Sequence, residues 1–575
     1  MRRRVFLSGV ILTGVGLPVL AGCKVPGWSK GQTGSTTAAS ASASAGGASG
    51  VPAASGAPQG WQQLDAHVVG HHLGFQVSPL VRRDEKTTVL ALKLTRAKDD
   101  AAVKEVSDSL NDHGSNVFEA DRPLTRQGGN RTYRPAAGGV RLLDLPTNRV
   151  WLATTGVEQT SKDNYANTIA LKPGETTTCF VLFGAVDAKQ VTVFVPQAGF
   201  VTVNVLDSGA AAASGIDFKA VDKAFDDVIS YSRDESKPIQ ALAAPAPIER
   251  YTKALDDSTS TLADNQKVTV TLASDVTFAS DSADLAPAAD AQLKTVAGQL
   301  AQYPDGGTLT IVGHTDDVQD DAYNQTLSEK RANAVKTRLA QLTKLDKWQT
   351  SVSGKGESEP KVNDTSDEAR AANRRVEITL TPTGGTTPKN TATPANGSSA
   401  TPNPTTSKLP DPKGPVAKGA DGVSVKHDNG AQLTITIDHV TRTGGYLLGQ
   451  LHTTISTTTD TAPDLKQWLT DKEVVFSNSR SEDGSSEPTE HAADGLTLLA
   501  GGERIYPADY RDAGFKTHVP LTELQLTPHI KAGTTTVCVV WPDPGGDTIT
   551  LDHAAPTKHI TDLAFRLTDI PIKNT

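Results

Sequence analysis

The chain has 575 residues, several times the length of an average domain, so we expect several folded modules rather than one core. The 56 basic and 65 acidic residues give a net charge of −9, which offers no electrostatic basis for binding nucleic acid. Only 37% of the residues are hydrophobic, and 49 Gly and 33 Pro predict long linkers between the modules. Three cysteines exclude a disulfide-built scaffold and a zinc cluster.

The first 22 residues have the features of an export signal. Three arginines precede an apolar stretch that ends at Ala21 and lies near the lower limit for a membrane span. Leu20-Ala21-Gly22-Cys23 resembles the bacterial lipobox, which implies that Cys23 carries acyl chains such as palmitate and anchors the protein to a membrane. The alternative is an ordinary secretory signal with a chance cysteine. Arg3-Arg4-Val5-Phe6-Leu7 also resembles a twin-arginine export motif.

Two stretches of low complexity separate the folded regions. Small, uncharged residues fill 31–60, and Pro, Thr, Asn and Gly dominate the stretch before 419, so neither favours a packed core. The chain is therefore divided, in order, into a signal peptide (1–22), a lipid-anchored flexible tether (23–60), a first β-domain (61–207), a connector in which one helix is expected (208–262), a central module (263–383), a Pro/Thr-rich disordered linker (384–419) and a second β-domain (420–575).

The two β-domains resemble each other, which predicts an internal repeat. Residues 172–180 match 531–539, and in both segments a glycine precedes a cysteine by five positions. Segments 138–151 and 494–506 also correspond, in the same order along the chain. Short Thr/Val/Ile/Leu runs between Gly, Pro and Asp are typical of antiparallel sandwiches, so we predict two similar all-β, sandwich-like domains.

Two features of these domains have a structural and a functional interpretation. Cys179 and Cys538 occupy equivalent strand positions, where each is either a small buried apolar residue or one half of an inter-domain disulfide. His71 and His72 could form a metal-binding pair, but no third ligand lies at a recognisable spacing. The favoured interpretation is a solvated pair near the start of a strand. No metal and no cofactor is predicted anywhere in the chain.

The central module alternates strand and helix patterns. A run of alternating polar and apolar residues, 267–272, predicts a strand, and a short apolar segment follows at 276–278. Pro287 opens a helix with one apolar face, and Ser328 is expected to cap a second helix. Strands are predicted at 308–313, 350–354 and 376–380. This βαβαββ pattern indicates an α+β layer with helices on one side of a sheet.

Four ordered motifs in this module resemble the OmpA-like peptidoglycan-binding domain. They are GHTDD at 313–317, YNQTLSEKRA at 323–332, GKGESEP at 354–360 and NRRVEI at 373–378. The resemblance implies non-covalent capture of the diaminopimelate residue of the cell-wall stem peptide, with Asp316 and Arg331 as the two ligand contacts. The residues suit this chemistry, because a zwitterionic ligand needs one anion and one cation, and Arg donates two parallel hydrogen bonds to a carboxylate.

Other positions of the motifs have less specific roles. On the residue pattern alone, Asp316 and Arg331 fit a structural salt bridge as well as a ligand site. The resemblance implies that four further residues shape the pocket, namely Thr315, Asn324, Leu327 and Ser328. For Asn373 and Arg375, a fold-supporting hydrogen-bond network is at least as compatible with the motif as ligand contact. Ala369-Arg370 replaces a Gly-Arg pair common in the family, which affects the local loop only.

The sequence predicts a cell-envelope lipoprotein that links the membrane to the wall. Its expected partners are peptidoglycan, the membrane through the N-terminal lipid, and a protein partner of the β-domains. It is expected to be exported and lipid-anchored to the cell membrane, or to the outer membrane in a two-membrane envelope. His314-Thr315-Asp316-Asp317 lacks the partners of a catalytic cluster, so no enzyme is predicted. The alternative is a wall-localised accessory or receptor protein whose β-domains bind a protein partner or carry an unrecognised hydrolase activity.

Overall fold

A computed structural model gives the fold of the chain. It describes residues 60–100, 118–119, 137–153, 170–223, 244–279, 281–386, 409–426, 430–457, 469, 492–511, 518–523, 526, 532–554 and 563–575. The chain divides into two units, Met1–Gly50 and Val51–Thr575, and the first lies outside the described residues. The predicted signal peptide, Cys23 and most of both predicted linkers also lie outside them. Among the described helices, none is long and apolar enough to cross a membrane.

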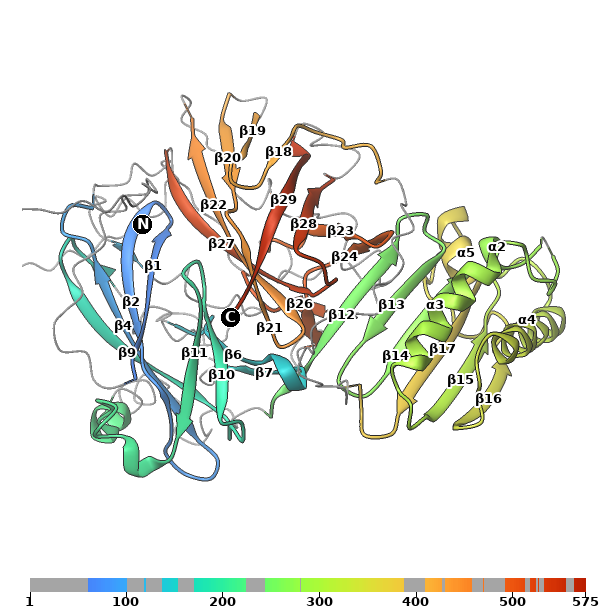
Figure 1. Ribbon diagram of the computed structural model, residues 1–575, viewed down its shortest axis with the longest axis horizontal. Helices are drawn as coiled ribbons and strands as arrows, with labels where there is room; N and C mark the ends of the chain where they lie inside the picture. Colours follow the sequence, from blue (N-terminus) through green and yellow to red (C-terminus); the bar gives the residue numbers. More distant parts are fainter. Residues whose placement is uncertain are drawn as a thin grey trace, which may run out of the picture. The chain divides into compact units, whose positions relative to one another are not determined.

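Most of the described elements are strands, and helices are few (Figure 1). The N-terminal β-region contains β1 (Gln62–Val68), β2 (His71–Val77), β3 (Leu80–Arg82), β4 (Thr88–Arg96), β5 (Phe118–Glu119), β6 (Arg141–Asp144), β7 (Arg149–Leu152), β8 (Ala170–Leu171), β9 (Thr176–Phe183), β10 (Gln190–Val195) and β11 (Gly199–Leu206). Two short 3-10 helices, Leu145–Thr147 and Ser208–Ala210, interrupt this series, and residues 218–223 are helical.

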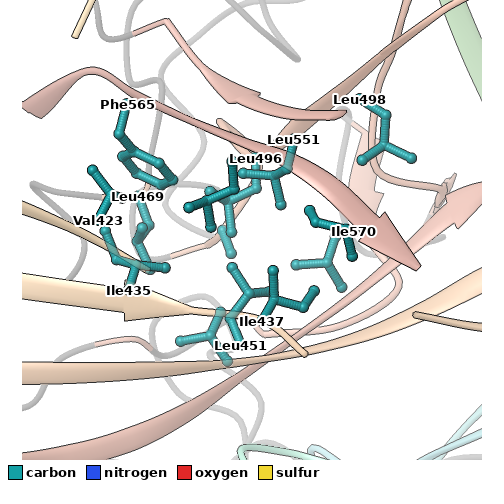
Figure 2. Close-up of a cluster of buried hydrophobic side chains, with 14 of the residues drawn as sticks. Val423, Ile435, Ile437, Leu451, Leu469, Leu496, Leu498, Leu551, Phe565 and Ile570 are labelled. Atoms are coloured by element: carbon teal, nitrogen blue, oxygen red, sulfur yellow. The ribbon is translucent and has the colours of Figure 1, made fainter. Parts of the chain in front are cut away.

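The named elements of the C-terminal β-region in the described part of the chain are strands. They are β18 (Val416–Lys418), β19 (Val423–Lys426), β20 (Gln432–Thr436), β21 (Val440–Thr443), β22 (Tyr446–Ser456), β23 (Thr497–Ala500), β24 (Glu503–Ile505), β25 (Asp509–Arg511), β26 (His518–Pro520), β27 (Ala532–Pro542), β28 (Thr548–His553) and β29 (Phe565–Asn574). Its apolar core draws on almost all of them, and the buried side chains labelled in Figure 2 come from strands and loops far apart in the sequence.

The two β-regions pair their strands in the same order and sense. In the N-terminal region the antiparallel chain β1–β2–β4–β9 corresponds to β19–β20–β22–β27 in the C-terminal region. The antiparallel set β7–β6–β10–β11 corresponds to β24–β23–β28–β29. Even the parallel pair β3–β11 has its counterpart in β21–β29. On this correspondence the two cysteine-bearing strands, β9 and β27, are equivalent.

A buried cluster joins the two β-regions. It contains apolar side chains from β6, β7 and β10 together with others from β22, β25, β26 and β27. Arg141 on β6 donates from Nη1 to the carbonyl oxygen of Leu521 at 2.7 Å. Glu523 accepts the backbone N–H of Gln197 at 2.9 Å and that of Cys538 at 3.1 Å through Oε1. Cys179 and Cys538 are free thiols, and Cys538 is fully buried, so they form no disulfide with each other.

The central region contains a four-stranded sheet with the order β14–β17–β15–β16. Strands β15 and β16 are parallel, and β17 lies antiparallel to both β14 and β15. The long helices α3 and α4 pack together and share one apolar core with the sheet. The elements are β14 (Val268–Ala273), α2 (Ser274–Thr277), α3 (Ala289–Ala301), β15 (Gly307–Gly313), α4 (Asp321–Leu342), β16 (Trp348–Gly354), α5 (Asp367–Asn373) and β17 (Arg375–Pro382).

The apolar segment at 276–278 lies mainly in the one-turn helix α2, because Ser274 to Thr277 leave the sheet after β14. One local prediction for this region was wrong. Ser328 lies inside α4 rather than at its start, and Asp320 is the N-cap, whose side chain accepts the N–H of Tyr323 at 2.9 Å. The first turns of α4 bury Asn324, Ser328 and Arg331 on the face that continues to Val335 and Leu339, so hydropathy does not reveal them as helix.

The predicted connector 208–262 contains two strands near its end. They are β12 (Ala246–Ala254) and β13 (Thr259–Ala263), and β13 pairs with β14, which extends the central sheet. Strand β12 also pairs with β7, β24 and β25 of the two β-regions. Its buried residues Ile248 and Tyr251 are three positions apart, so the segment lacks the period-two pattern that predicts strands.

Candidate functional site

A cavity of about 430 Å³ opens at the end of the central sheet where β15 runs into its following loop. Helix α4, the short helix α2 and the junction between α5 and β17 supply its other walls. Its lining includes five of the residues that the sequence motifs single out. The complete lining is Ser274, Asp275, Phe278, Ala279, Asp281, Thr315, Asp316, Val318, Gln319, Tyr323, Asn324, Leu327, Arg331 and Arg374.

Asp316 provides a fixed carboxylate in this cavity. Its Oδ2 lies 2.6 Å from Nη1 of Arg374, and its side chain is only 14% exposed. Arg374 is itself held by Asp275 through two bonds, Nε to Oδ1 at 2.7 Å and Nη2 to Oδ2 at 2.6 Å. These contacts raise the pKa of Arg374, the pair with Asp275 most strongly. The ion pairs from Asp275 to Arg374 and from Arg374 to Asp316 therefore fix the orientation of the Asp316 carboxylate through one of its oxygens.

Arg331 provides the cation. It is 5% exposed, its Nε donates to the carbonyl oxygen of Ser282 at 3.0 Å, and its guanidinium lies 5.1 Å from the centre of the Phe278 ring. Within the described residues its terminal nitrogens have no hydrogen-bond partner, so the fork can receive a ligand. Burial lowers the pKa of Arg331, although the neighbouring carboxylates of Asp275, Asp281 and Asp316 act in the opposite direction. Arg331 stays charged, as arginine does in proteins.

Asn324 holds the loop that carries Asp316. Its Nδ2 donates to the carbonyl oxygens of Asp316 at 3.2 Å and Gln319 at 3.0 Å, and to Oε2 of Glu357 at 2.7 Å. The backbone N–H of Thr315 donates to the carbonyl oxygen of Gly356 at 2.9 Å, which joins Thr315 to the loop after β16. The amide of Asn324 thus sets the position of the Asp316 backbone from the first turn of α4.

Two of the predicted site residues do not line the cavity. Ser328 is fully buried, where its Oγ donates to the carbonyl oxygen of Gln325 at 2.8 Å and accepts the N–H of Gly356 at 3.0 Å. Arg375 bonds through Nε to Glu377 at 2.7 Å and through a terminal nitrogen to the carbonyl oxygen of Asn373 at 3.3 Å. Asn373 in turn clamps the backbone of Val362 through both atoms of its amide. These residues support the fold around the cavity.

Arg374 and Asp275 also line the cavity, and the sequence motifs do not single them out. Arg374 directly precedes Arg375 in the NRRVEI motif, and spacing cannot tell which of two adjacent arginines faces the cavity before the end of α5 is known. Asp275 lies some forty positions upstream of Asp316, in a helix of one turn that hydropathy does not predict. The two adjacent arginines of the NRRVEI motif are the signal in the sequence that points to Arg374.

His314 and Asp317 do not join Asp316 in an acid–base cluster. His314 is 2% exposed, and neither of its ring nitrogens has a hydrogen-bond partner within the described residues. Burial, with the nearby charge of Arg375, lowers the pKa of His314 to about 4, so its ring is neutral near pH 7. Asp317 instead pairs with Arg370 at 2.7 Å on the surface.

Two groups of residues have the chemistry of metal ligands. Glu249, Asp509 and His518 bring three ligand atoms within 4.8 Å of one another, and Nε2 of His518 lies 2.7 Å from Oε2 of Glu249, which is an ion-pair distance. His71 is buried, not solvated as predicted, with its Nδ1 at 2.9 Å from Asp100, while His72 bonds to Asp65. The two histidines therefore face different carboxylates.

Comparison with known proteins identifies one part of the chain. Residues 277–374 match the OmpA family model, so this segment is an OmpA-family domain. The chain is 43% identical over 103 residues to outer membrane porin F of Pseudomonas aeruginosa, a match that covers 18% of this chain and 29% of the porin. It is 35% identical over 116 residues to the probable lipoprotein YiaD of Escherichia coli, covering 20% of this chain and 52% of that protein.

Two further matches cover a similar share of this chain. Outer membrane protein A of Citrobacter freundii is 36% identical over 156 residues, which cover 25% of this chain and 58% of that protein. The chain thus spans less than two thirds of each of these relatives. A solved structure of the cell wall anchor of the T6SS from Pseudomonas aeruginosa is 31% identical, covers 20% of this chain and 83% of that chain, and has a TM-score of 0.18.

Proposed function

We propose that the protein binds peptidoglycan non-covalently through the cavity between α2 and α4. The observation that carries the proposal is that a carboxylate, Asp316, and a guanidinium, Arg331, line one cavity. In this proposal Asp316 accepts the ammonium of a diaminopimelate residue, and Arg331 binds its free carboxylate through two hydrogen bonds. The likeness to OmpA and to a probable lipoprotein supports a place in the cell envelope.

We propose that the protein is a linker rather than an enzyme. In this proposal acylated Cys23 anchors it, the stretch 23–60 tethers it to the membrane, and the central region holds the wall. The chain matches envelope proteins that are named as porins and membrane proteins. The corresponding strand pairing of the two β-regions supports an internal duplication, with the β-regions as spacing or partner-binding modules. A hydrolase would clear a suspension of cell walls, and we expect no loss of turbidity.

The site is tested by sedimentation of the full chain with insoluble peptidoglycan. We expect Asp316→Ala or Arg331→Ala to weaken binding at least about tenfold, since a charged hydrogen bond contributes about 1.5–3 kcal/mol. The chain offers matched controls. Asp317→Ala removes the neighbouring acid, which pairs with Arg370, and Arg338→Ala removes a cation of α4 that pairs with Asp290. Full retention of both site variants would contradict the assignment.

The anchor is tested separately. Cys23→Ser removes the only thiol that an acyl transferase could modify in the lipobox-like motif, so the protein should move from the membrane to the soluble fraction after cell disruption. Cys179→Ser is the matched control, because Cys179 lies in β9 of the folded part. Unchanged membrane partitioning of Cys23→Ser would exclude a lipid anchor and leave peptidoglycan binding untouched.

A further inference from the structure

One rim of the binding cavity carries apolar side chains that are open to solvent. Among the described residues, large hydrophobic side chains are strongly exposed at Val318 (60%), Tyr323 (41%), Val416 (49%) and Leu409 (38%). The first two line the cavity of the central region. Single exposed apolar residues are normal on proteins, but two beside one cavity indicate a contact surface.

The apolar residues continue a helical stripe that ends at the charged group. Tyr323, Leu327 and Arg331 are four residues apart along α4, so they lie on one face of the helix, and all three line the cavity. Eight residues of helix extend about 12 Å. The cavity is therefore charged where Arg331 lies and apolar about two turns away, where Tyr323 stands and where Val318 projects from the loop before the helix.

A stem peptide has the same sequence of chemical groups. Diaminopimelate has its free ammonium and carboxylate at one end, followed by three methylene groups and then by the peptide backbone with a neighbouring alanine. The arm and one extended residue span on the order of 10 Å. A ligand that places its zwitterion between Asp316 and Arg331 thus has methylene and methyl groups at the distance of the apolar residues.

We propose that Val318 and Tyr323 form an apolar rim that binds the methyl group of the alanine that follows diaminopimelate in the stem peptide. The inference rests on the proposed function of the cavity. On this inference the site binds the stem peptide more tightly than free diaminopimelate. The charged groups bind the zwitterionic end of either ligand, and the rim adds affinity only when the alanine is present.

The test compares two ligands by titration calorimetry with the full chain: free diaminopimelate, and a stem tetrapeptide that ends in diaminopimelyl-alanine. We expect Tyr323→Ala and Val318→Ser to weaken tetrapeptide binding by about tenfold and about threefold, and free diaminopimelate by less than twofold. Val416→Ser is the matched control, because Val416 is also an exposed valine but lies outside the cavity, and it should change neither affinity. Thermal melts of each variant check that the fold is intact.

The outcomes separate this inference from the proposed function. If the wild-type chain binds neither ligand, or if Asp316→Ala binds both as before, the proposed function fails. If the wild-type chain binds both and the rim variants keep full tetrapeptide affinity, only the rim is refuted. Equal losses for the two ligands would also refute it, because the variants would then act on the charged end. Sensitivity confined to fragments that carry the disaccharide would make the occupant a sugar ring and overturn the proposal.

Discussion

The buried polar residues of α4 show how single side chains build the cavity. Burying an amide or hydroxyl without a partner costs about 1–3 kcal/mol, so each must be hydrogen-bonded where it is placed. Asn324 uses its amide to hold the Asp316 loop, and Ser328 uses its hydroxyl to hold the loop at Gly356. The residues are close in sequence but differ in role, because Asn324 lines the cavity whereas Ser328 lies behind it.

This difference predicts that Ser328→Ala affects stability more than binding. The substitution leaves the N–H of Gly356 without its acceptor, which should lower the free energy of unfolding by about 1–3 kcal/mol. Affinity of the folded protein for peptidoglycan should stay within about twofold. Urea unfolding and sedimentation measure the two effects, with the exposed Ser351→Ala on β16 as the control. A loss of binding in a variant of undiminished stability would place Ser328 in the site instead.

At the scale of elements, two glycines allow α4 to lie close to the ends of β15 and β16. A Cβ on Gly313 would stand 2.1 Å from the carbonyl oxygen of Ser328, which is far too close. A Cβ on Gly354 would meet the backbone nitrogen of Glu329 at 2.5 Å. The helix rests on these strand ends just where it presents Arg331 to the cavity, so the glycines determine the separation of Asp316 and Arg331.

Gly313→Ala should therefore displace α4 and impair both stability and binding. We expect a loss of about 2–4 kcal/mol in unfolding free energy and reduced retention on peptidoglycan, since overpacking of this kind shifts backbone. The contrasting variant is Gly298→Ala within α3, where an added Cβ meets nothing within 4 Å. It should stabilise the protein by up to about 1 kcal/mol through helix propensity. Equal effects of Gly313→Ala and Gly298→Ala on stability would contradict the claim that Gly313 is needed for the close approach of α4.

At the scale of the whole molecule, one carboxyl group joins the two β-regions. Glu523 is 2% exposed and accepts backbone N–H groups of Gln197 from one region and Cys538 from the other. Burial raises the pKa of Glu523 to about 7, although these hydrogen bonds and the charge of Arg141 oppose the shift. Because the folded state binds this proton more tightly than the unfolded chain does, the protonated form is the one that stabilises the fold.

The stability contribution of Glu523 should consequently depend on pH. It is fully present below the unfolded-state pKa near 4.5, falls as the pH rises to about 7, and is constant above that. Glu523→Gln keeps an uncharged acceptor at every pH, so its unfolding free energy relative to wild type should rise by roughly 1–3 kcal/mol between pH 4.5 and 8. Denaturant unfolding at both pH values measures this, with the exposed Glu175→Gln as control; a pH-independent difference would contradict it.

How far the sequence predicts this molecule depends on where polar residues are buried. Strands β14, β15, β16 and β17 and the core face of α3 follow from alternation and helical periodicity, since the side chains that they contribute to the hydrophobic core are apolar. The start of α4 does not, because its buried face is polar at Asn324 and Arg331. Ordered motifs lead to Asp316 and Arg331, but the contact of Asp316 with Arg374 depends on how α5 ends, which no spacing encodes.

Strand β12 has a mechanical consequence if the protein joins a membrane to a wall, as proposed. Thr252 and Lys253 pair with β13 on one edge and with β24 on the other, while the start of the strand pairs with β25 and β7. Tension applied to the chain at the start of the central region passes along this strand, which is hydrogen-bonded to both β-regions. Hydrogen bonds along both edges then share the load in shear, so rupture requires many of them to break together rather than one after another.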